Sequence, residues 1–259
     1  MAGFLSPERT GRSVLGIAWY AQGFFALLRY LATHLSALTV RPTRLVLFKQ
    51  IYFTGIEALG AVSIIAVLTG IVITTQITSL VGVNATLTAK IMLWVVVREL
   101  GPLLTAIVII ARSSSAAASE LAGMKIRGEL DSLRQMGIEP MDYLIVPRIA
   151  GITLSVMAVT FYFQMLAIIA GIGFTALTHG IPFAGTLGSV VSLLTLGEVA
   201  ASFFKTLVFG LVVSITSCYY GLRAPATTTA IPQAATAAVV RNLLTVFLLD
   251  GVITYAVFL

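Results

Sequence analysis

Five long apolar runs constrain this chain more than any other feature of its sequence. A helix needs about 20 mostly apolar residues to cross the hydrocarbon of a bilayer, and each run has about that length or more. Hydrophobic residues make up 58% of the chain and charged residues 10%, against about 25% charged in soluble domains. The sequence therefore predicts an all-α integral membrane protein and excludes both a water-soluble globule and a disordered chain. The predicted spans are 51–77, 91–111, 149–177, 199–222 and 239–259.

A sixth apolar run, 14–38, precedes the first span and has a polar stripe. Gln22, Arg29, Thr33 and Ser36 share one face of a helix with 3.6 residues per turn. The opposite face carries Trp19, Phe24, Leu27, Leu28 and Leu31. This pattern is typical of a helix that lies in the membrane interface, although the sequence leaves open whether the run crosses the membrane. We therefore assign residues 1–50 to a cytoplasmic N-terminal segment with an interfacial helix.

The basic residues predict the orientation of the chain. Of the 16 lysines and arginines, thirteen fall on one side of a five-span topology, one (Lys90) on the other, and two within spans. Basic residues concentrate in cytoplasmic segments, so we expect a cytoplasmic N-terminus and a periplasmic C-terminus. The net charge of +6 is then explained by topology, and no nucleic-acid partner is expected.

The motifs of several enzyme classes are missing from the sequence. None of the four lysines follows a glycine, so the chain has no P-loop for ATP. One cysteine, Cys218, and two histidines, His34 and His179, leave little for a metal site. We therefore expect no catalytic residue, no metal and no cofactor in this chain, and an energy source in a partner.

The connection between the second and third spans predicts an amphipathic helix over about 113–137. Leucines and methionines recur at three- and four-residue steps, and Gly137 is placed to cap the helix C-terminus. Its apolar face either packs on the spans or docks a soluble partner in a groove. The residues that we single out on this helix are Glu120, Met124, Lys125, Glu129 and Leu133.

Several short motifs give the chain a resemblance to a known family. They are Arg-Glu-Leu-Gly-Pro at 98–102, Met-Gly-Ile-Glu-Pro at 136–140 and Tyr-Leu-Ile-Val-Pro-Arg at 143–148. Together they resemble the MlaE/YrbE family, the permease subunits of bacterial lipid-transporting ABC systems of the Mla and Mce type. The resemblance runs from about residue 45 to the end. The chain departs from the family pattern at Ala122, where a glycine is usual, and at Lys49, where some members have arginine.

The resemblance implies a fold, a location and a set of partners. It implies a five-span permease domain over 51–259 in the bacterial inner membrane, working as a homodimer that moves phospholipid or a related lipid. It also implies cytoplasmic ABC ATPase subunits, which would hold ATP and Mg, and a periplasmic MCE-domain protein. The 113–137 helix would be the coupling helix that contacts the ATPase.

Charged residues inside the spans are the candidate site residues. Arg98 lies about 12 Å beyond Lys90 along a helix, and a charge at the bilayer centre costs about 2.5–3.5 kcal/mol. We predict a lipid-binding site made of Lys49, Arg98 and Glu99. In this hypothesis Arg98 faces a polar cavity and meets lipid phosphate, while Glu99 orients Arg98 or pairs with Lys49 or another basic group. The alternative is a structural ion pair between spans. Lys205 and Asp250 fall at similar depth, and we expect them to form such a pair.

Two other function classes remain open from the residues alone. A proton-coupled secondary transporter of a lipophilic substrate would use Glu57, Glu99 and Asp250 as a relay, although such proteins commonly show paired repeats and this sequence shows none. An integral membrane enzyme would need convergent His, Cys, Asp or Ser groups near one interface, and the sequence gives no sign of them.

Overall fold

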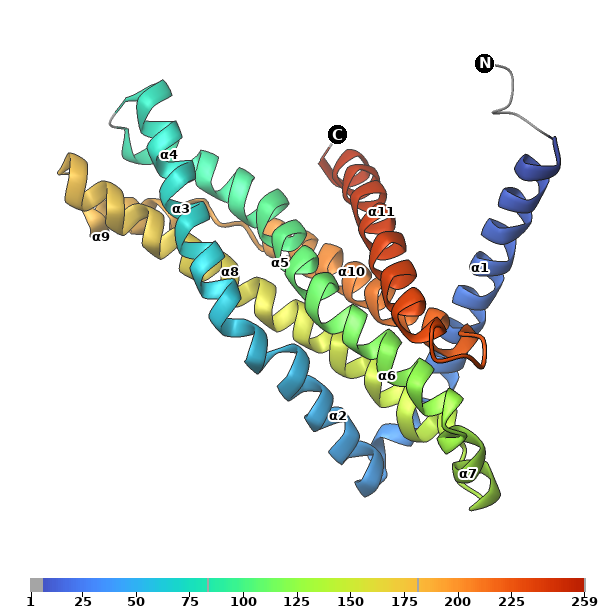
Figure 1. Ribbon diagram of the computed structural model, residues 1–259. Helices are drawn as coiled ribbons and strands as arrows, with labels where there is room; N and C mark the ends of the chain where they lie inside the picture. The colour runs from blue at the N-terminus through green and yellow to red at the C-terminus, as the bar shows by residue number, and fades with distance from the viewer. Residues whose placement is uncertain (1–6, 83, 181, 259) are drawn as a thin grey trace.

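The computed structural model describes residues 7–82, 84–180 and 182–258, and every regular element within these ranges is a helix. Five of the helical segments are long and apolar enough to cross a membrane (Figure 1). They are Arg41–Leu80, Thr86–Ile126, Met141–His179, Leu196–Arg223 and Ala230–Ala256. The all-α class and the five predicted spans are therefore confirmed.

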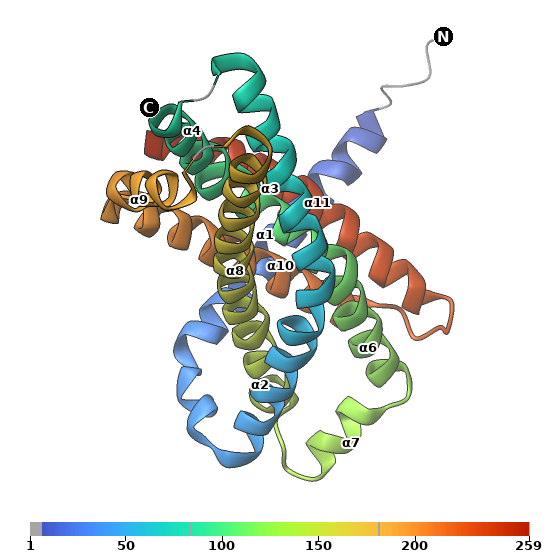
Figure 2. The same ribbon diagram turned by 90° about the vertical axis from the view of Figure 1, so that its left-hand side faces the viewer.

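The helices pack together as an elongated bundle (Figures 1 and 2). The N-terminal segment and the first span contain α1 (Pro7–Thr33), η1 (Leu35–Thr39), α2 (Arg41–Thr54), η2 (Ile56–Ala58) and α3 (Leu59–Val81). The second span contains α4 (Ala85–Met92), η3 (Leu93–Leu100), α5 (Gly101–Ile109), η4 (Ile110–Ser114) and α6 (Ser115–Ile126). After them come α7 (Glu129–Gln135), η5 (Met141–Ile145), α8 (Val146–His179), α9 (Phe183–Leu193), α10 (Leu196–Arg223) and α11 (Ala230–Phe258). We call the two ends the α7 end and the α9 end.

The first helical span is longer than its apolar run and is not straight. It begins at Arg41, ten residues before the predicted start, with Pro42 in its first turn, where the missing N–H costs nothing. At Gly55 the α-helix gives way to the short 3₁₀ turn of η2, which contains Glu57, and α3 then continues. A polar residue is thereby placed at a break in the span.

Helix α8 is the centre of the bundle and lies between α3 and α10 (Figures 1 and 2). Its crossing with α3 is a backbone contact. A Cβ on Gly70 would lie 2.1 Å from the carbonyl oxygen of Ala167, and one on Gly171 would lie 2.7 Å from that of Gly70. Small residues allow membrane helices to approach closely and gain dispersion contacts. The α3–α8 crossing therefore depends on these two glycines.

The predicted helix over 113–137 is divided in two. Its first part, α6, continues the second span without a break and ends at Ile126. Gly128 then adopts a φ of +74°, a left-handed conformation that favours glycine, and α7 begins at Glu129. Gly137, with a φ of +76°, ends α7 as predicted: its N–H bonds the Arg134 carbonyl, and the Ile138 N–H bonds that of Leu133. This pair of hydrogen bonds is the Schellman motif.

The N-terminal helix α1 presents the two faces that the sequence predicts. Gln22, Arg29 and Thr33 of α1 are exposed, as is Ser36 of η1, whereas Phe24, Leu27, Leu28 and Leu31 pack in a cluster with Ile149 and Ile215. The side chain of Trp19 lies outside the described residues. Whether α1 lies in the plane of the interface stays a prediction.

Two tyrosines fasten α1 to the bundle. The hydroxyl groups of Tyr20 and Thr216 lie 2.7 Å apart, and Tyr30 donates a hydrogen bond of 2.9 Å to Asp142. Partial burial, and then the Asp142 carboxylate, raise the pKa of Tyr30 to about 12. Tyr30 therefore remains a protonated donor throughout the physiological pH range.

The glycine contact between α3 and α8 gives a direct test of the packing. Gly70→Val should lower the free energy of unfolding by about 3 kcal/mol, because backbone atoms of α8 cannot move out of the way as a side chain can. Gly60→Val is the matched control on α3, since a Cβ there meets no atom within 4 Å. Unfolding in mixed detergent micelles measures both. Equal stability of the two variants would contradict the close crossing.

Candidate functional site

The candidate site begins with a widened helical turn in the second span. Helix η3 is a π-helix, and the N–H of Gly101 bonds the carbonyl of Val96, five residues earlier. The next residue, Pro102, has no N–H. The carbonyls of Val97 and Arg98, which the N–H of a residue at 102 would bond in a π- or an α-helix, therefore each lose that donor in their own helix. Buried carbonyls of this kind need donors from elsewhere.

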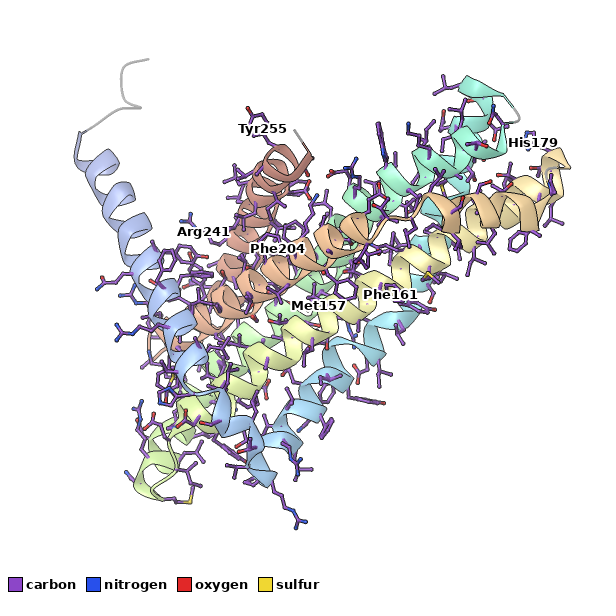
Figure 3. The ribbon with its side chains drawn as sticks, turned by 180° about the vertical axis from the view of Figure 1, so that it is seen from behind. Met157, Phe161, His179, Phe204, Arg241 and Tyr255 are labelled. Atoms are coloured by element: carbon purple, nitrogen blue, oxygen red, sulfur yellow. The ribbon has the colours of Figure 1, made fainter. Side chains whose placement is uncertain are left out.

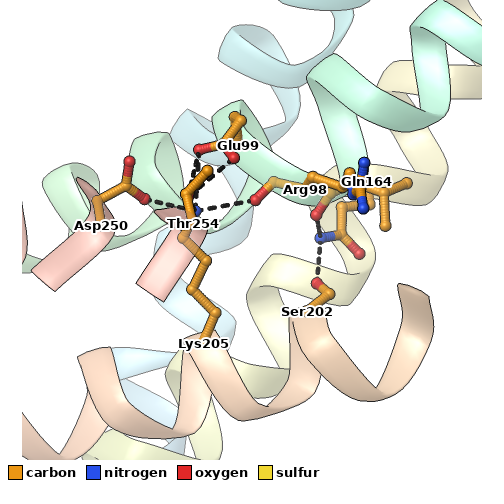
Figure 4. Close-up of polar contacts among 8 residues, drawn as sticks. Arg98, Glu99, Gln164, Ser202, Lys205, Asp250 and Thr254 are labelled. Atoms are coloured by element: carbon orange, nitrogen blue, oxygen red, sulfur yellow. Dashed lines mark hydrogen bonds and ion pairs between the residues drawn. The ribbon is translucent and has the colours of Figure 1, made fainter. Parts of the chain in front are cut away.

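Side chains from two other spans supply those donors (Figure 4). Gln164 on α8 donates from Nε2 to the Val97 carbonyl at 3.1 Å and to Ser202 Oγ at 2.8 Å. Lys205 on α10 donates from Nζ to the Arg98 carbonyl at 3.0 Å. The π-helix is thus held open by α8 and α10.

Lys205 is also the centre of a group of three charged residues and one threonine. We call this group, made of Glu99, Lys205, Asp250 and Thr254, the membrane charge cluster. The Lys205 ammonium lies 2.9 Å from Glu99 Oε2, 2.7 Å from Asp250 Oδ1 and 3.0 Å from Thr254 Oγ1. Thr254 in turn donates to Glu99 Oε1 at 2.9 Å. The ion pair expected between Lys205 and Asp250 is therefore present, and Glu99 adds a second carboxylate (Figure 4). The cluster joins the second, fourth and fifth spans.

Burial makes these contacts strong. Only 1% of Lys205 is exposed, and an ammonium ion taken out of water costs several kcal/mol unless oxygens replace its hydration. Here four oxygens surround it. Two carboxylates against one ammonium leave the cluster with a net negative charge when all three groups are ionised, and Arg98 is the next residue to Glu99 along the chain.

Arg98 and Glu99 point in different directions, as adjacent residues on a helix do. Glu99 points to Lys205, so its suggested pairing with Lys49 is wrong and its partner is another basic residue. The guanidinium carbon of Arg98 lies 5.6 Å from the centre of the Trp94 ring. Lys90 Nζ lies 5.5 Å from the same ring, and Trp94 is half exposed. Arg98 therefore belongs to an aromatic and basic surface beside the charge cluster.

A small pocket lies beside Gln164, between α8 and α10. Its lining includes Met157 and Phe161 of α8, with Gln164 and Ser202, and Figure 3 shows Met157 and Phe161 along the face of α8. Its volume is about 60 Å³. Ligand sites usually have about 300–1,000 Å³, so this pocket is too small to hold a lipid head group.

Lys49 lies elsewhere. It lines a cavity of about 810 Å³ at the α7 end, together with Glu57, Arg112, Glu120 and Arg148. Arg112 forms an ion pair with Glu57, and Arg148 Nη2 lies 2.8 Å from Glu120 Oε2. The structure therefore separates the three residues that the sequence grouped for lipid binding: Lys49 from Arg98 and Glu99.

The residues singled out on the 113–137 segment contact their own chain. Lys125 Nζ donates to the carbonyls of Leu222 at 2.8 Å and Ala224 at 2.9 Å, at the end of α10. Glu129 pairs with Arg127 at 2.5 Å, and Glu120 pairs with Arg148. Met124 and Leu133 pack against a buried cluster that includes Leu121 and Ile145. Their direct contact with an ATPase stays a prediction.

The most exposed apolar side chains near α7 are ones that the sequence reasoning did not choose. Met136 is 65% exposed and Ile138 is 39% exposed, on either side of Gly137. Both residues flank the predicted capping glycine in the Met-Gly-Ile-Glu-Pro motif, but the sequence carries no signal that their side chains would be exposed.

Sequence reasoning also missed a buried polar contact between the second, fourth and fifth spans. Asn242 is fully buried, and its Nδ2 donates to Ser114 Oγ at 2.8 Å. Ser217 Oγ donates to the same Ser114 oxygen at 2.8 Å. Single serines and asparagines in apolar runs carry no sequence signal that they will meet.

Comparison with known proteins identifies similar chains. The family model described as Permease MlaE matches residues 47–256. A probable ABC transporter permease protein of Synechocystis is 31% identical over 212 residues, which are 81% of this chain and 81% of that protein. A probable ABC transporter permease protein of Rickettsia typhi is 27% identical and covers 91% of this chain and 92% of its own length. The chloroplastic protein TRIGALACTOSYLDIACYLGLYCEROL 1 of Arabidopsis thaliana is 29% identical over 80% of this chain and 59% of its own length.

The membrane charge cluster predicts a large effect for loss of its cation. Lys205→Met should lower the free energy of unfolding by about 3–5 kcal/mol, because two carboxylates and the Arg98 carbonyl lose their common donor. The double variant Lys205→Met with Asp250→Asn should recover part of that loss. Lys90→Met is the control for removing a lysine from the exposed surface. Strictly additive effects of the two cluster substitutions would show that the pair is not coupled.

Proposed function

This chain belongs to the family of the permease MlaE, and on that basis we propose that it is the membrane subunit of a lipid-transporting ABC system. In this proposal it moves phospholipid or a related lipid between the bacterial inner membrane and a periplasmic MCE-domain carrier. Two copies form a homodimer, and separate ATPase subunits bind ATP and Mg and supply the energy. The relatives named as ABC transporter permeases support the transport role, and the Arabidopsis relative carries the name of a glycolipid.

The observation that carries the lipid proposal is the position of Arg98. Its guanidinium group lies on a partly exposed surface within the second span, beside Trp94 and next to the buried cluster. A guanidinium ion binds phosphate with two parallel hydrogen bonds. Glu99, held by Lys205, fixes the π-helix that presents Arg98. In this proposal Arg98 contacts the head group, and Glu99 acts as a positioning residue.

The distribution of basic residues supports the orientation. Lys125, Arg127, Arg134 and Arg148 all belong to segments at the α7 end (Figure 1), and only Lys90 is expected on the other side. We therefore assign the α7 end to the cytoplasm and the C-terminus to the periplasm. This orientation presents α7 to a cytoplasmic ATPase.

The contacts of α6 and α7 support a route for mechanical coupling. In this proposal the ATPase binds the tip of α7 through Met136 and Ile138, while Glu129 and Leu133 hold α7 in place. Lys125 then ties α6 to the last carbonyls of α10. Because α10 also carries Lys205, a displacement at α7 would reach the membrane charge cluster through α6 and then α10.

The proton-coupled alternative finds less support in the arrangement of carboxylates. Glu57 is bound to Arg112, whereas Glu99 and Asp250 share Lys205. Among the described residues no hydrogen bond links Glu57 to the other two, so these three groups do not form one relay.

The transport proposal predicts a specific defect for Arg98→Ala. In proteoliposomes that contain the ATPase and the carrier, lipid transfer should fall about tenfold, because a charge-assisted contact to phosphate is lost. Dimer formation and ATPase copurification should be unchanged. Lys90→Ala is the matched control, since Lys90 lies against the same Trp94 ring. Full transfer activity in Arg98→Ala would overturn the assignment, and proton uptake without any ATPase would favour the alternative.

The coupling proposal predicts the effect of a charge at the α7 tip. Met136→Asp should weaken association with the ATPase about tenfold or more, because an exposed apolar anchor becomes a charge in the interface. Met136→Leu should preserve association. Pull-down from detergent gives the measurement, with thermal unfolding to show that the free chain is intact. Normal association of Met136→Asp would exclude this surface.

A further inference from the structure

The cavity at the α7 end is an amphiphilic space between the first, second and third spans. Its volume of about 810 Å³ lies within the usual range for small-molecule sites, about 300–1,000 Å³. Phe53 of α2, Leu144 of η5 and Ile231 of α11 form its apolar parts. Charged side chains from α2, η2, η4, α6, α8 and the turn after α6, together with uncharged polar side chains, line other parts of it. A lipid head group would fit the charged part of the cavity, and a short length of its acyl chain would fit the apolar part.

Two arginines in the cavity wall have hydrogen-bonding capacity beyond their ion pairs. Arg148 is only 4% exposed; Nη1 donates to the Ala117 carbonyl at 3.3 Å and Nη2 donates to Glu120. Its Nε and the Nη1 of Arg112 are buried and have no acceptor among the described residues. Guanidinium N–H groups that are buried without an acceptor cost free energy, which a bound anion would recover.

The charges that line the cavity favour an anion. Lys49, Arg112, Arg127 and Arg148 face two carboxylates, those of Glu57 and Glu120. Glu129 neutralises Arg127 from outside the cavity, which leaves one net positive charge. That charge corresponds to Lys49, for which the described residues provide no ion pair. Its ammonium lies 5.8 Å from the centre of the Phe53 ring, at the cavity wall.

We propose that this cavity binds a phosphate group through Lys49, Arg112 and Arg148, as a second head-group site separate from Arg98. The apolar wall favours a phosphate that belongs to a lipid, and this choice of source rests on the proposed function. The prediction that the cavity binds an anion does not rest on the proposed function. Because the three cations come from α2, η4 and α8, a bound phosphate would tie the first three spans together at the α7 end.

A fluorescence titration of the full chain tests the proposal. Phe53→Trp, in a background in which Trp19 and Trp94 are replaced by phenylalanine, makes the cavity wall the site of the sole tryptophan in the sequence. The protein is held in dodecyl maltoside, which contains no phosphate. The two titrants are phosphatidylglycerol and diacylglycerol, each with the same doxyl-labelled acyl chain. Phosphatidylglycerol should quench the reporter at lower concentration than diacylglycerol does, and Lys49→Gln should weaken that binding about threefold to tenfold.

Lys90→Gln is the matched control for Lys49→Gln. Both lysines lie against an aromatic ring four residues later in the chain, Lys49 against Phe53 and Lys90 against Trp94. Arg112→Gln serves as a second cavity variant, judged only if its thermal unfolding is cooperative. Lys90→Gln should leave the preference for phosphatidylglycerol unchanged.

The outcomes separate the sources and the two proposals. Displacement of phosphatidylglycerol by inorganic phosphate would show a general phosphate site, and no displacement would show a lipid head-group site. Equal quenching by the two lipids, or an unchanged preference in Lys49→Gln, would overturn the inference. The proposed transport function would not be contradicted in that case, because its test is the effect of Arg98→Ala on lipid transfer in proteoliposomes.

Discussion

The hydrogen bond from Lys205 to the Arg98 carbonyl holds the spans of this protein together. Pro102 cannot supply that carbonyl with a backbone donor. A proline in the middle of a membrane span removes one hydrogen bond, and the bilayer offers no water to replace it. Lys205 fills that role from α10 and is itself paired with Glu99 and Asp250. Each group in the cluster is costly when buried alone. The cluster is therefore stable only when the second, fourth and fifth spans are all in place.

This arrangement makes α10 a helix with a polar anchor near each end. Lys205 joins it to the middle of the second span, and the carbonyls of Leu222 and Ala224 accept hydrogen bonds from Lys125 of α6. Between the anchors, Ser217 and Asn242 add a buried polar contact to Ser114. A rigid element with discrete polar contacts is the kind of structure that transmits a displacement over distance.

The sequence predicts the features that depend on composition and depth. The five spans follow from the apolar runs, the stop after α7 follows from Gly137, and the pair of Lys205 with Asp250 follows from their similar depth. The break at Gly128 was missed because a glycine in a helical pattern does not show whether its φ will be positive. The contacts of Gln164 with Val97 and of Lys125 with α10 were missed because they depend on which helices become neighbours, and one sequence does not show that.

If the protein transports lipid as proposed, the same packing restricts where that lipid can pass. Within one chain the α3–α8 crossing brings backbone against backbone at Gly70 and Gly171, and the pocket between α8 and α10 is too small for a head group. The basic groups proposed to contact a head group, Arg98 on the surface of the second span and Lys49 in the wall of the cavity at the α7 end, belong to the first two spans. A lipid that meets both would therefore move along the outer surface of those spans. Such a surface is open to the bilayer unless a second copy covers it, and this supports the proposed homodimer as the enclosure of the lipid path.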